Sequence, residues 1–216
     1  MLIIFDFDDT LIDTSGAITP FKLKECLDYL VSCGLKVDGS AHQELLALNE
    51  KMARSKEAIE AFVRKYGGDS SLVAQALEKL SGPLPDDFVV PTTPNAKEIL
   101  EFFKGKAHLV LVTAGKGSFQ REKLKKAGIE PSVFSNMAIP EDGVKKPFYK
   151  GFLAEFSVAP DQVWVCGDRP LVDLKPAHEL GMKTIHMRWG RGATAKTEDW
   201  VDYTISDLGE LKRIIG

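Results

Sequence analysis

The chain has 216 residues, of which 44% are hydrophobic and 27% are charged, a composition that excludes a disordered protein. Its formal net charge of −3 excludes a general attraction to nucleic acid or to an anionic membrane, so a phosphate-bearing ligand needs a local site or a metal ion. No apolar run approaches the about 18 residues of a membrane-spanning helix, so we expect no membrane partner.

Short apolar runs rich in branched residues alternate along the chain with longer amphipathic segments. The apolar runs predict strands at residues 2–5, 108–112, 133–139, 162–166 and 183–187. The amphipathic patterns predict helices at residues 95–103, 118–127, 149–156 and 170–180. Gly128 and Gly181 are expected to cap the C-termini of two of these helices. This alternation predicts an α/β fold with a parallel sheet covered by helices on both faces.

One segment, residues 18–82, interrupts this alternation because it contains no convincing strand. Helices are predicted within it near residues 21–33, 41–53, 56–66 and 71–80, separated by glycine-rich breaks. We therefore expect a small all-helical domain over residues 18–82, inserted into an α/β core formed by residues 1–17 and 83–216.

The three cysteines indicate a reducing compartment. Cys26 and Cys33 stand seven residues apart in a helical pattern, Cys166 lies in an apolar run, and no Cys-x-x-Cys spacing occurs. We expect three reduced, partly buried thiols. The N-terminus lacks the basic region and hydrophobic stretch of a signal peptide, so the cytoplasm is the expected location.

Polar residues stand at or soon after the ends of four predicted strands. In chain order they are Asp6-Phe7-Asp8-Asp9-Thr10, Thr113-Ala114-Gly115, Lys145-Lys146-Pro147, and Gly167-Asp168 followed by Asp173. Because the carboxyl ends of parallel strands line one edge of a sheet, we expect these groups to converge in one crevice.

These groups resemble the four motifs of the haloacid dehalogenase superfamily, in the order and context of that family. The resemblance rests on Asp6-x-Asp8-x-Thr10-Leu11, on Thr113 after a strand, on Lys146-Pro147, and on Gly167-Asp168 with Asp173. It covers residues 1–17 and 83–216 and implies a Rossmann-like core. The segment 18–82 is similar to the helical cap of the family in size and position, although we recognise no signature within it.

Crowded carboxylates repel one another, and a divalent cation compensates them. Mg²⁺ prefers hard oxygen ligands, and no His or Cys pair stands at the spacing that zinc or copper would need. We expect Mg²⁺ to be held by the side chains of Asp6 and Asp168 and by the backbone carbonyl of Asp8. Asp173 would contact the ion through water or orient the loop.

The resemblance implies a catalytic role for each matching residue. Asp6 would attack a phosphoryl group and form an aspartyl-phosphate, and Asp8 would protonate the leaving oxygen and then activate water. Thr113 and the backbone amides of Ala114 and Gly115 would bind phosphoryl oxygens. Lys146 would offset the negative charge, and its placement before proline favours it over the neighbouring Lys145.

The acid at position 8 favours phosphate-ester hydrolysis over carbon–halogen cleavage, because an alkoxide leaving group needs a proton and a halide does not. The expected substrate is a small phosphorylated metabolite, and Asp9, which stands where many relatives have glycine, receives no catalytic role. Two alternatives stay open. A phosphomutase would use the same intermediate, and a signalling receiver would combine acids, a threonine and a lysine around Mg²⁺.

Overall fold

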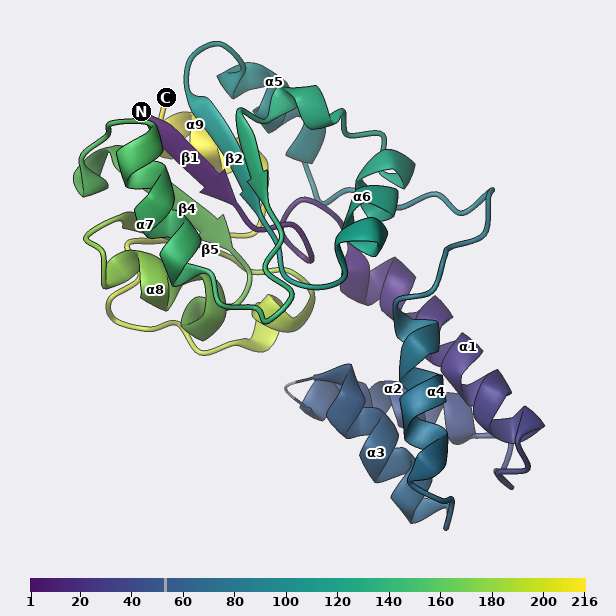
Figure 1. Cartoon of the computed structure of the whole chain (residues 1–216). Helices are drawn as coiled ribbons and strands as arrows, with labels where there is room; N and C mark the ends of the chain where they lie inside the picture. The colour runs from purple at the N-terminus through teal and green to yellow at the C-terminus, as the bar shows by residue number, and fades with distance from the viewer. Residues whose placement is uncertain (53) are drawn as a thin grey trace. The chain divides into compact units, whose positions relative to one another are not determined.

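The computed structural model describes residues 1–52 and 54–216, which fall into two compact units. One unit consists of Met1–Ser15 and Pro85–Gly216 and contains the sheet, and the other is the helical segment Gly16–Leu84. Figure 1 shows the strands in the first unit and helices α1 to α4 in the second.

Within the described residues, the first unit is built on a parallel sheet of six strands in the order β3-β2-β1-β4-β5-β6. The strands are β1 (Leu2–Phe5), β2 (His108–Val112), β3 (Asn136–Ala138), β4 (Val163–Gly167), β5 (Lys183–Met187) and β6 (Tyr203–Ile205). β1 lies at the centre, with Leu2 in register with His108 of β2 and with Val163 of β4. The chain continues from β1 to β2 on one side and later returns to β4 on the other. The carboxyl end of β1 is therefore a topological switch point, where ligands bind in open α/β sheets. The predicted α/β class is confirmed.

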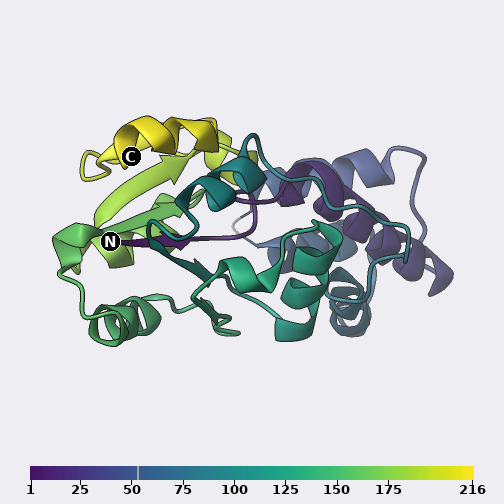
Figure 2. The ribbon, with the colours of Figure 1, turned by 90° about the horizontal axis from the view of Figure 1, so that it is seen from above.

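Helices cover both faces of this sheet. They are α5 (Ala96–Phe103), α6 (Gly117–Lys126), α7 (Lys146–Glu155), α8 (Lys175–His178) and α9 (Leu211–Ile214). Figure 2 shows α7 on one side of the sheet and α5 and α9 on the other. Leu2, Ile4 and Val110 pack with Tyr149 and Phe152 of α7 in one buried cluster. Every residue of β1 is buried, as expected for a strand with helices on both faces.

The second unit has a hydrophobic core of its own. It contains α1 (Thr19–Ser32), α2 (Ala41–Lys51), α3 (Ser55–Lys65) and α4 (Ser71–Leu80), and α1 packs on α4 while α2 packs on α3. Leu30, Leu45 and Phe62 are fully buried in this core. The helix predicted for residues 41–53 ends at Lys51, and Ala53 lies outside the described residues.

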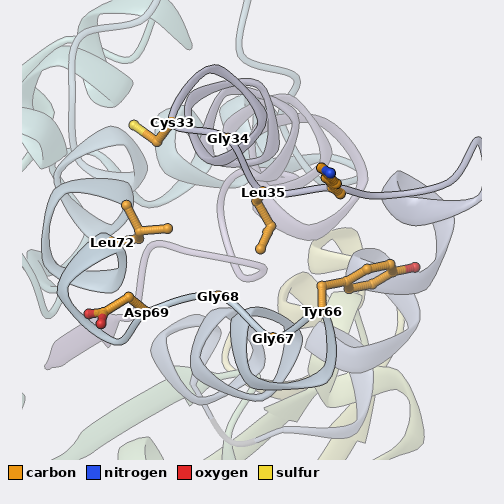
Figure 3. A pocket seen from close by; sticks show the side chains of 9 residues that line it. Cys33, Gly34, Leu35, Tyr66, Gly67, Gly68, Asp69 and Leu72 are labelled. Atoms are coloured by element: carbon orange, nitrogen blue, oxygen red, sulfur yellow. The ribbon is translucent and has the colours of Figure 1, made fainter.

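A hollow of about 450 Å³ lies in the helical unit, beside the segments that follow α1 and α3. Figure 3 shows Leu35, Tyr66 and Leu72 around it. Cys33, at the end of α1, also lines the hollow and is exposed, so the expectation of three partly buried thiols is wrong at this position. Cys26 and Cys166 are buried, and all three thiols are free. Burial raises the pKa of Cys26 to about 12, which makes this thiol unreactive.

The bounds of several elements differ from the sequence-based expectation, as in α7, which begins at Lys146 and not at residue 149. Three further differences have a clear structural form. The strand predicted at residues 133–139 is shorter, because Pro131–Val133 forms a helical turn before β3. The helix predicted at residues 170–180 divides into a wide turn, Pro170–Leu174, and α8. β6 was not predicted, since it is a three-residue edge strand whose first two residues are exposed. In the described part of the chain, every helix is too short or too polar to cross a lipid bilayer.

Candidate active site

Asp6 lies directly after β1, at the centre of the sheet edge. Its backbone N–H donates to the carbonyl of Cys166 in β4 over 2.9 Å, which continues the strand pairing into the loop after β1. Lys145 precedes α7 and donates to Asp6 Oδ1 over 2.5 Å and to Asp173 Oδ1 over 2.7 Å. Burial opposes the charge of Lys145, but Asp173 and Asp6 outweigh it and hold the pKa of this lysine well above its usual range. The lysine therefore stays cationic between two acids.

The loop after β4 supplies the other two carboxylates, Asp168 and Asp173. Asp173 Oδ2 accepts a hydrogen bond of 2.9 Å from the backbone N–H of Arg169, so both of its oxygens have donors. This packing needs a glycine at position 167, because a Cβ there would lie 2.6 Å from Cβ of Asp173. The side chain of Asp168 has no hydrogen-bond donor among the described residues, although the residue is only 2% exposed. His186 holds the backbone of Asp168 instead, with Nε2 3.1 Å from its carbonyl oxygen.

Asp6, Asp168 and Asp173 form a buried cluster, each offering an oxygen within 4.8 Å of those of the other two. Burial raises the pKa of Asp6 to about 7, because the lowering effect of Lys145 is too small to cancel it and the negative charge of Asp173 adds to it. Burial and the neighbouring Asp173 and Asp6 raise the pKa of Asp168 well above its usual range. Three ionised acids and one ammonium carry a formal charge of −2, and Asp168 lacks a donor. All three side chains offer only oxygen atoms as metal ligands, so this cluster fits a hard divalent cation such as Mg²⁺.

Asp8 lies apart from this cluster, and its carboxylate is held by three side chains. Thr14 donates to Oδ1 over 2.5 Å, Gln120 donates to Oδ2 over 2.9 Å, and Lys123 forms an ion pair with Oδ1. Burial alone would raise the pKa of Asp8, but Lys123 and the two hydrogen bonds lower it below the usual value. The first loop thus presents two carboxylates in opposite electrostatic surroundings, Asp6 with a raised pKa and Asp8 with a lowered one.

Thr113 follows β2 and is buried, and Gln120 Nε2 lies 2.7 Å from its Oγ1. Ala114 and Gly115 continue the loop towards α6. The carbonyl of Ala114 accepts from Gln120 over 2.6 Å, and the N–H of Gly115 donates to the carbonyl of Pro140.

Asp9 adopts a left-handed backbone conformation with φ of +56°, which glycine adopts more readily than other residues. Its carboxylate accepts from the N–H of Ser15 over 2.7 Å and from the hydroxyl of Ser15 over 2.5 Å. Gly190, in the loop after β5, lies so close that a Cβ would fall 2.2 Å from Cγ of Asp9. The next contact along this loop joins Trp189 Nε1 to Asp13 Oδ1 over 3.0 Å. Asp9 is therefore a structural residue, and its hydrogen bonds to Ser15 stabilise the turn after Asp8.

The sequence favoured Lys146 over Lys145 for the site, whereas the structure brings Lys145 to the acids. Lys146 is exposed and pairs with Glu179 over 2.6 Å on the surface. Lys146 is the first residue of α7, so its side chain leaves the helix in a different direction from that of its predecessor. Proximity to Pro147 therefore did not identify the buried lysine.

Sequence reasoning missed Gln120 and Lys123, the two residues of α6 that hold Asp8. A signal was present, because residues 120, 123, 124 and 127 repeat at helical spacing and all four are buried. Two polar residues on the buried face of an amphipathic helix indicate partners inside the fold.

The model of the haloacid dehalogenase-like hydrolase family matches residues 3–187 of the chain. The match includes β1 except for Leu2, β2 to β5, the loops that carry Asp6, Thr113, Lys145 and Asp168, and the helical unit, and it ends before the loop of Trp189 and Gly190. The chain therefore belongs to the haloacid dehalogenase-like hydrolase family, and the resemblance found from its motifs is confirmed.

Similar proteins agree with this assignment. A glyceraldehyde 3-phosphate phosphatase of Methanocaldococcus jannaschii is 27% identical over 99% of this chain and 96% of that protein. A magnesium-bound structure of a protein assigned as a HAD-hydrolase of Bacillus subtilis has a TM-score of 0.75 at 18% identity, covering 100% of this chain and 98% of that one. A HAD phosphatase of Thermococcus onnurineus has a TM-score of 0.67 at 23% identity, covering 100% and 97%. The two structural likenesses establish the fold.

Proposed function

We propose that this hydrolase is a Mg²⁺-dependent phosphatase that cleaves a small phosphomonoester through an aspartyl-phosphate on Asp6. The observation that carries the proposal is the buried cluster of Asp6, Asp168 and Asp173 with Lys145. A cluster of this charge suits a cation and an anionic substrate together. Without a cation, the burial of these ionised carboxylates would cost free energy of folding.

Asp6 and Asp168 would hold the ion, with Asp173 and the carbonyl of Asp8 near it. When bound, Mg²⁺ supplies positive charge that offsets the repulsion between the nucleophilic carboxylate and the phosphoryl oxygens. Asp173 has a further role in the chain itself, since its two oxygens fix Lys145 and the N–H of Arg169 in place.

The residues around Asp6 have separate roles in the proposed reaction. Asp6 attacks phosphorus as the ester oxygen leaves, and Lys145, already 2.5 Å from Asp6, offsets charge on the transferring group. The hydroxyl of Thr113 and the amide of Ala114 donate to phosphoryl oxygens, and the amide of Gly115 would join them only by leaving the carbonyl of Pro140. Asp8 must first take up a proton, because its lowered pKa favours the carboxylate. The acid then gives this proton to the leaving oxygen, and the carboxylate so formed takes one from the water that hydrolyses the aspartyl-phosphate.

The substrate class follows from the relatives. The curated protein of M. jannaschii and a second relative from Pyrococcus furiosus, each 27% identical to this chain, are both named glyceraldehyde 3-phosphate phosphatases. We therefore propose a small sugar phosphate of this kind as the substrate. The helical unit, Gly16–Leu84, would serve as the cap that selects the leaving group and excludes bulk water.

A panel of phosphate esters that includes glyceraldehyde 3-phosphate, other sugar phosphates and p-nitrophenyl phosphate tests this function. We expect release of inorganic phosphate with Mg²⁺, none with EDTA, and the highest kcat/KM on a small sugar phosphate. Hydrolysis without an added bisphosphate distinguishes a phosphatase from a phosphomutase. Phosphate release that is unchanged by EDTA, or no release from any ester, would refute the proposal.

A further inference from the structure

Gln120 connects two parts of the site that act on different atoms of a substrate. Its Nε2 lies 2.9 Å from Asp8 Oδ2, 2.7 Å from Thr113 Oγ1 and 2.6 Å from the carbonyl oxygen of Ala114. The carboxylate and the carbonyl can only accept hydrogen bonds, so the amide nitrogen of Gln120, and not its oxygen, faces them. Gln120 is 4% exposed, which protects these contacts from water.

The contact with Gln120 determines what the hydroxyl of Thr113 can do. A hydroxyl has one hydrogen to donate and two lone pairs that accept. Gln120 Nε2 has two hydrogens for three acceptors, so Oγ1 of Thr113 at most shares one of them, but an amide nitrogen accepts no hydrogen bond and the hydroxyl hydrogen therefore cannot point at it. Among the described residues, no acceptor contacts the hydroxyl. The hydrogen of Thr113 is therefore available to a ligand that only accepts, as phosphoryl oxygens do.

The same helix fixes the orientation of Asp8. Gln120 contacts Oδ2 and Lys123, one turn further along α6, pairs with Oδ1. Lys123 is 4% exposed, and its ammonium also lies within 6 Å of the rings of Phe7 and Phe119. A carboxylate held at both oxygens cannot rotate freely, so its free lone pairs keep one direction.

We propose that Gln120 is a positioning residue for both Thr113 and Asp8, and that Lys123 is a positioning residue for Asp8 alone. Gln120 directs the hydroxyl of Thr113 towards the phosphoryl group. Gln120 and Lys123 together hold Asp8 for proton transfer with the leaving oxygen. This inference rests on the proposed phosphatase reaction, and neither residue touches the reacting atoms.

Gln120 contacts both Asp8 and Thr113, whereas Lys123 contacts only Asp8 of these two, so replacing them should affect activity differently. Replacing Lys123→Met disturbs Asp8 and leaves the contact between Gln120 and Thr113 in place, so activity falls most for esters whose leaving group needs a proton. Phenyl phosphate would lose about tenfold more kcat/KM than p-nitrophenyl phosphate, because proton transfer by a positioned acid contributes at least that much. Competitive inhibition by inorganic phosphate stays as in the wild type.

Replacing Gln120→Leu disturbs both neighbours, so it adds a second effect. We expect the same dependence on leaving group together with a rise of about tenfold in the inhibition constant for inorganic phosphate, since Thr113 loses its fixed direction. Gln120→Glu keeps the shape but replaces the donor by an acceptor beside Asp8. This variant therefore separates hydrogen-bond donation from packing, and it should be at least as impaired as Gln120→Leu.

The experiment measures kcat/KM on the two aryl phosphates, inhibition by inorganic phosphate, and the melting temperature for each variant. Lys125→Met, an exposed lysine of the same helix, is the matched control and should behave as the wild type. Equal losses on both esters with unchanged phosphate inhibition, or full activity of Gln120→Glu, would overturn the inference. A wild-type protein that hydrolyses neither ester would instead contradict the proposed function on which the inference depends.

Discussion

Lys145 Nζ lies 2.5 Å from Oδ1 of Asp6, with the lysine side chain 2% and the aspartate side chain 8% exposed. The two residues lie 139 positions apart in the sequence, and the order of the sheet brings them together, since β1 lies centrally and α7 leads into β4 beside it. Removing one partner of a buried ion pair leaves the other charge uncompensated. Replacing Lys145 therefore leaves Asp6 without its cation, whereas replacing Asp6 leaves Lys145 paired with Asp173.

The assignment of Lys145 is tested by replacing each lysine of the Lys145-Lys146 pair with methionine. Lys145→Met removes the only ammonium that contacts the cluster in the described chain, so we expect a loss of at least about a hundredfold in kcat/KM on p-nitrophenyl phosphate. Lys146→Met loses only an exposed pair with Glu179 and should change activity by less than about twofold. The opposite ranking of the two variants would show that Lys146 acts in the site.

The stability of the metal-free protein should depend on pH in a direction set by Asp6. Its folded-state pKa of about 7 lies above the ordinary 3.8, so its contribution is fully present below pH 3.8 and is lost as pH rises through 7. Asp8, whose pKa is lowered, contributes in the opposite sense and only under acidic conditions. Mg²⁺ competes with protons for Asp6. Its stabilising effect should therefore grow with pH.

The measurement is the melting temperature with EDTA and with excess Mg²⁺. We expect the increase caused by Mg²⁺ to be several degrees greater at about pH 8 than at about pH 5.5. An equal increase at both pH values would mean that the ion and the protons do not share a site.

The space around Asp173 is tested by Gly167→Ala. The added Cβ would lie 2.6 Å from Cβ of Asp173, so the variant should lose about 1–3 kcal/mol of unfolding free energy and bind Mg²⁺ more weakly. Gly151→Ala is the control, because this exposed residue of α7 has no atom within 4 Å of a new Cβ. The control should gain about 0.5–1 kcal/mol, the usual difference between alanine and glycine in a helix. Chemical denaturation measures both changes, and a Gly167→Ala protein as stable as the wild type would contradict the packing described here.

The nucleophile is tested by Asp6→Asn, which keeps the shape of the side chain and removes its charge. We expect turnover of p-nitrophenyl phosphate to fall below about a thousandth of the wild-type value. The metal-free variant should fold and melt no lower than the wild type at about pH 8, because one of three crowded acids has become neutral. Wild-type-like turnover by this variant would exclude Asp6 as the nucleophile.

Much of the fold could be predicted because its strongest elements have simple patterns. The bounds of β1, β2 and β5 were predicted to the residue, since these strands are continuous apolar runs between polar loops. β6 could not be predicted, because its stability comes from pairing with β5 and only Ile205 of its three residues is buried. Patterns in a short exposed segment carry little information about such pairing.

The site was less predictable than the fold, and two residues show why. The acids stand at strand ends, where topology alone brings them together. The choice between Lys145 and Lys146 depends on a single step of helical rotation, which no pattern in the loop records. Gln120 lies inside a helix and was missed because its function depends on Asp8, 112 positions earlier in the chain.

The central claim is that a divalent cation compensates the buried acids around Asp6. Isothermal titration of Mg²⁺ into the purified wild-type protein and its Asp168→Asn variant near neutral pH tests it most directly. We expect the wild type to bind one ion per chain and to release protons as it does so, because the raised pKa values of Asp6 and Asp168 leave protons to be displaced. We expect the variant, which loses the only acid of the three without a donor, to bind far more weakly. Equal binding by both proteins, or no binding by the wild type, would contradict the claim.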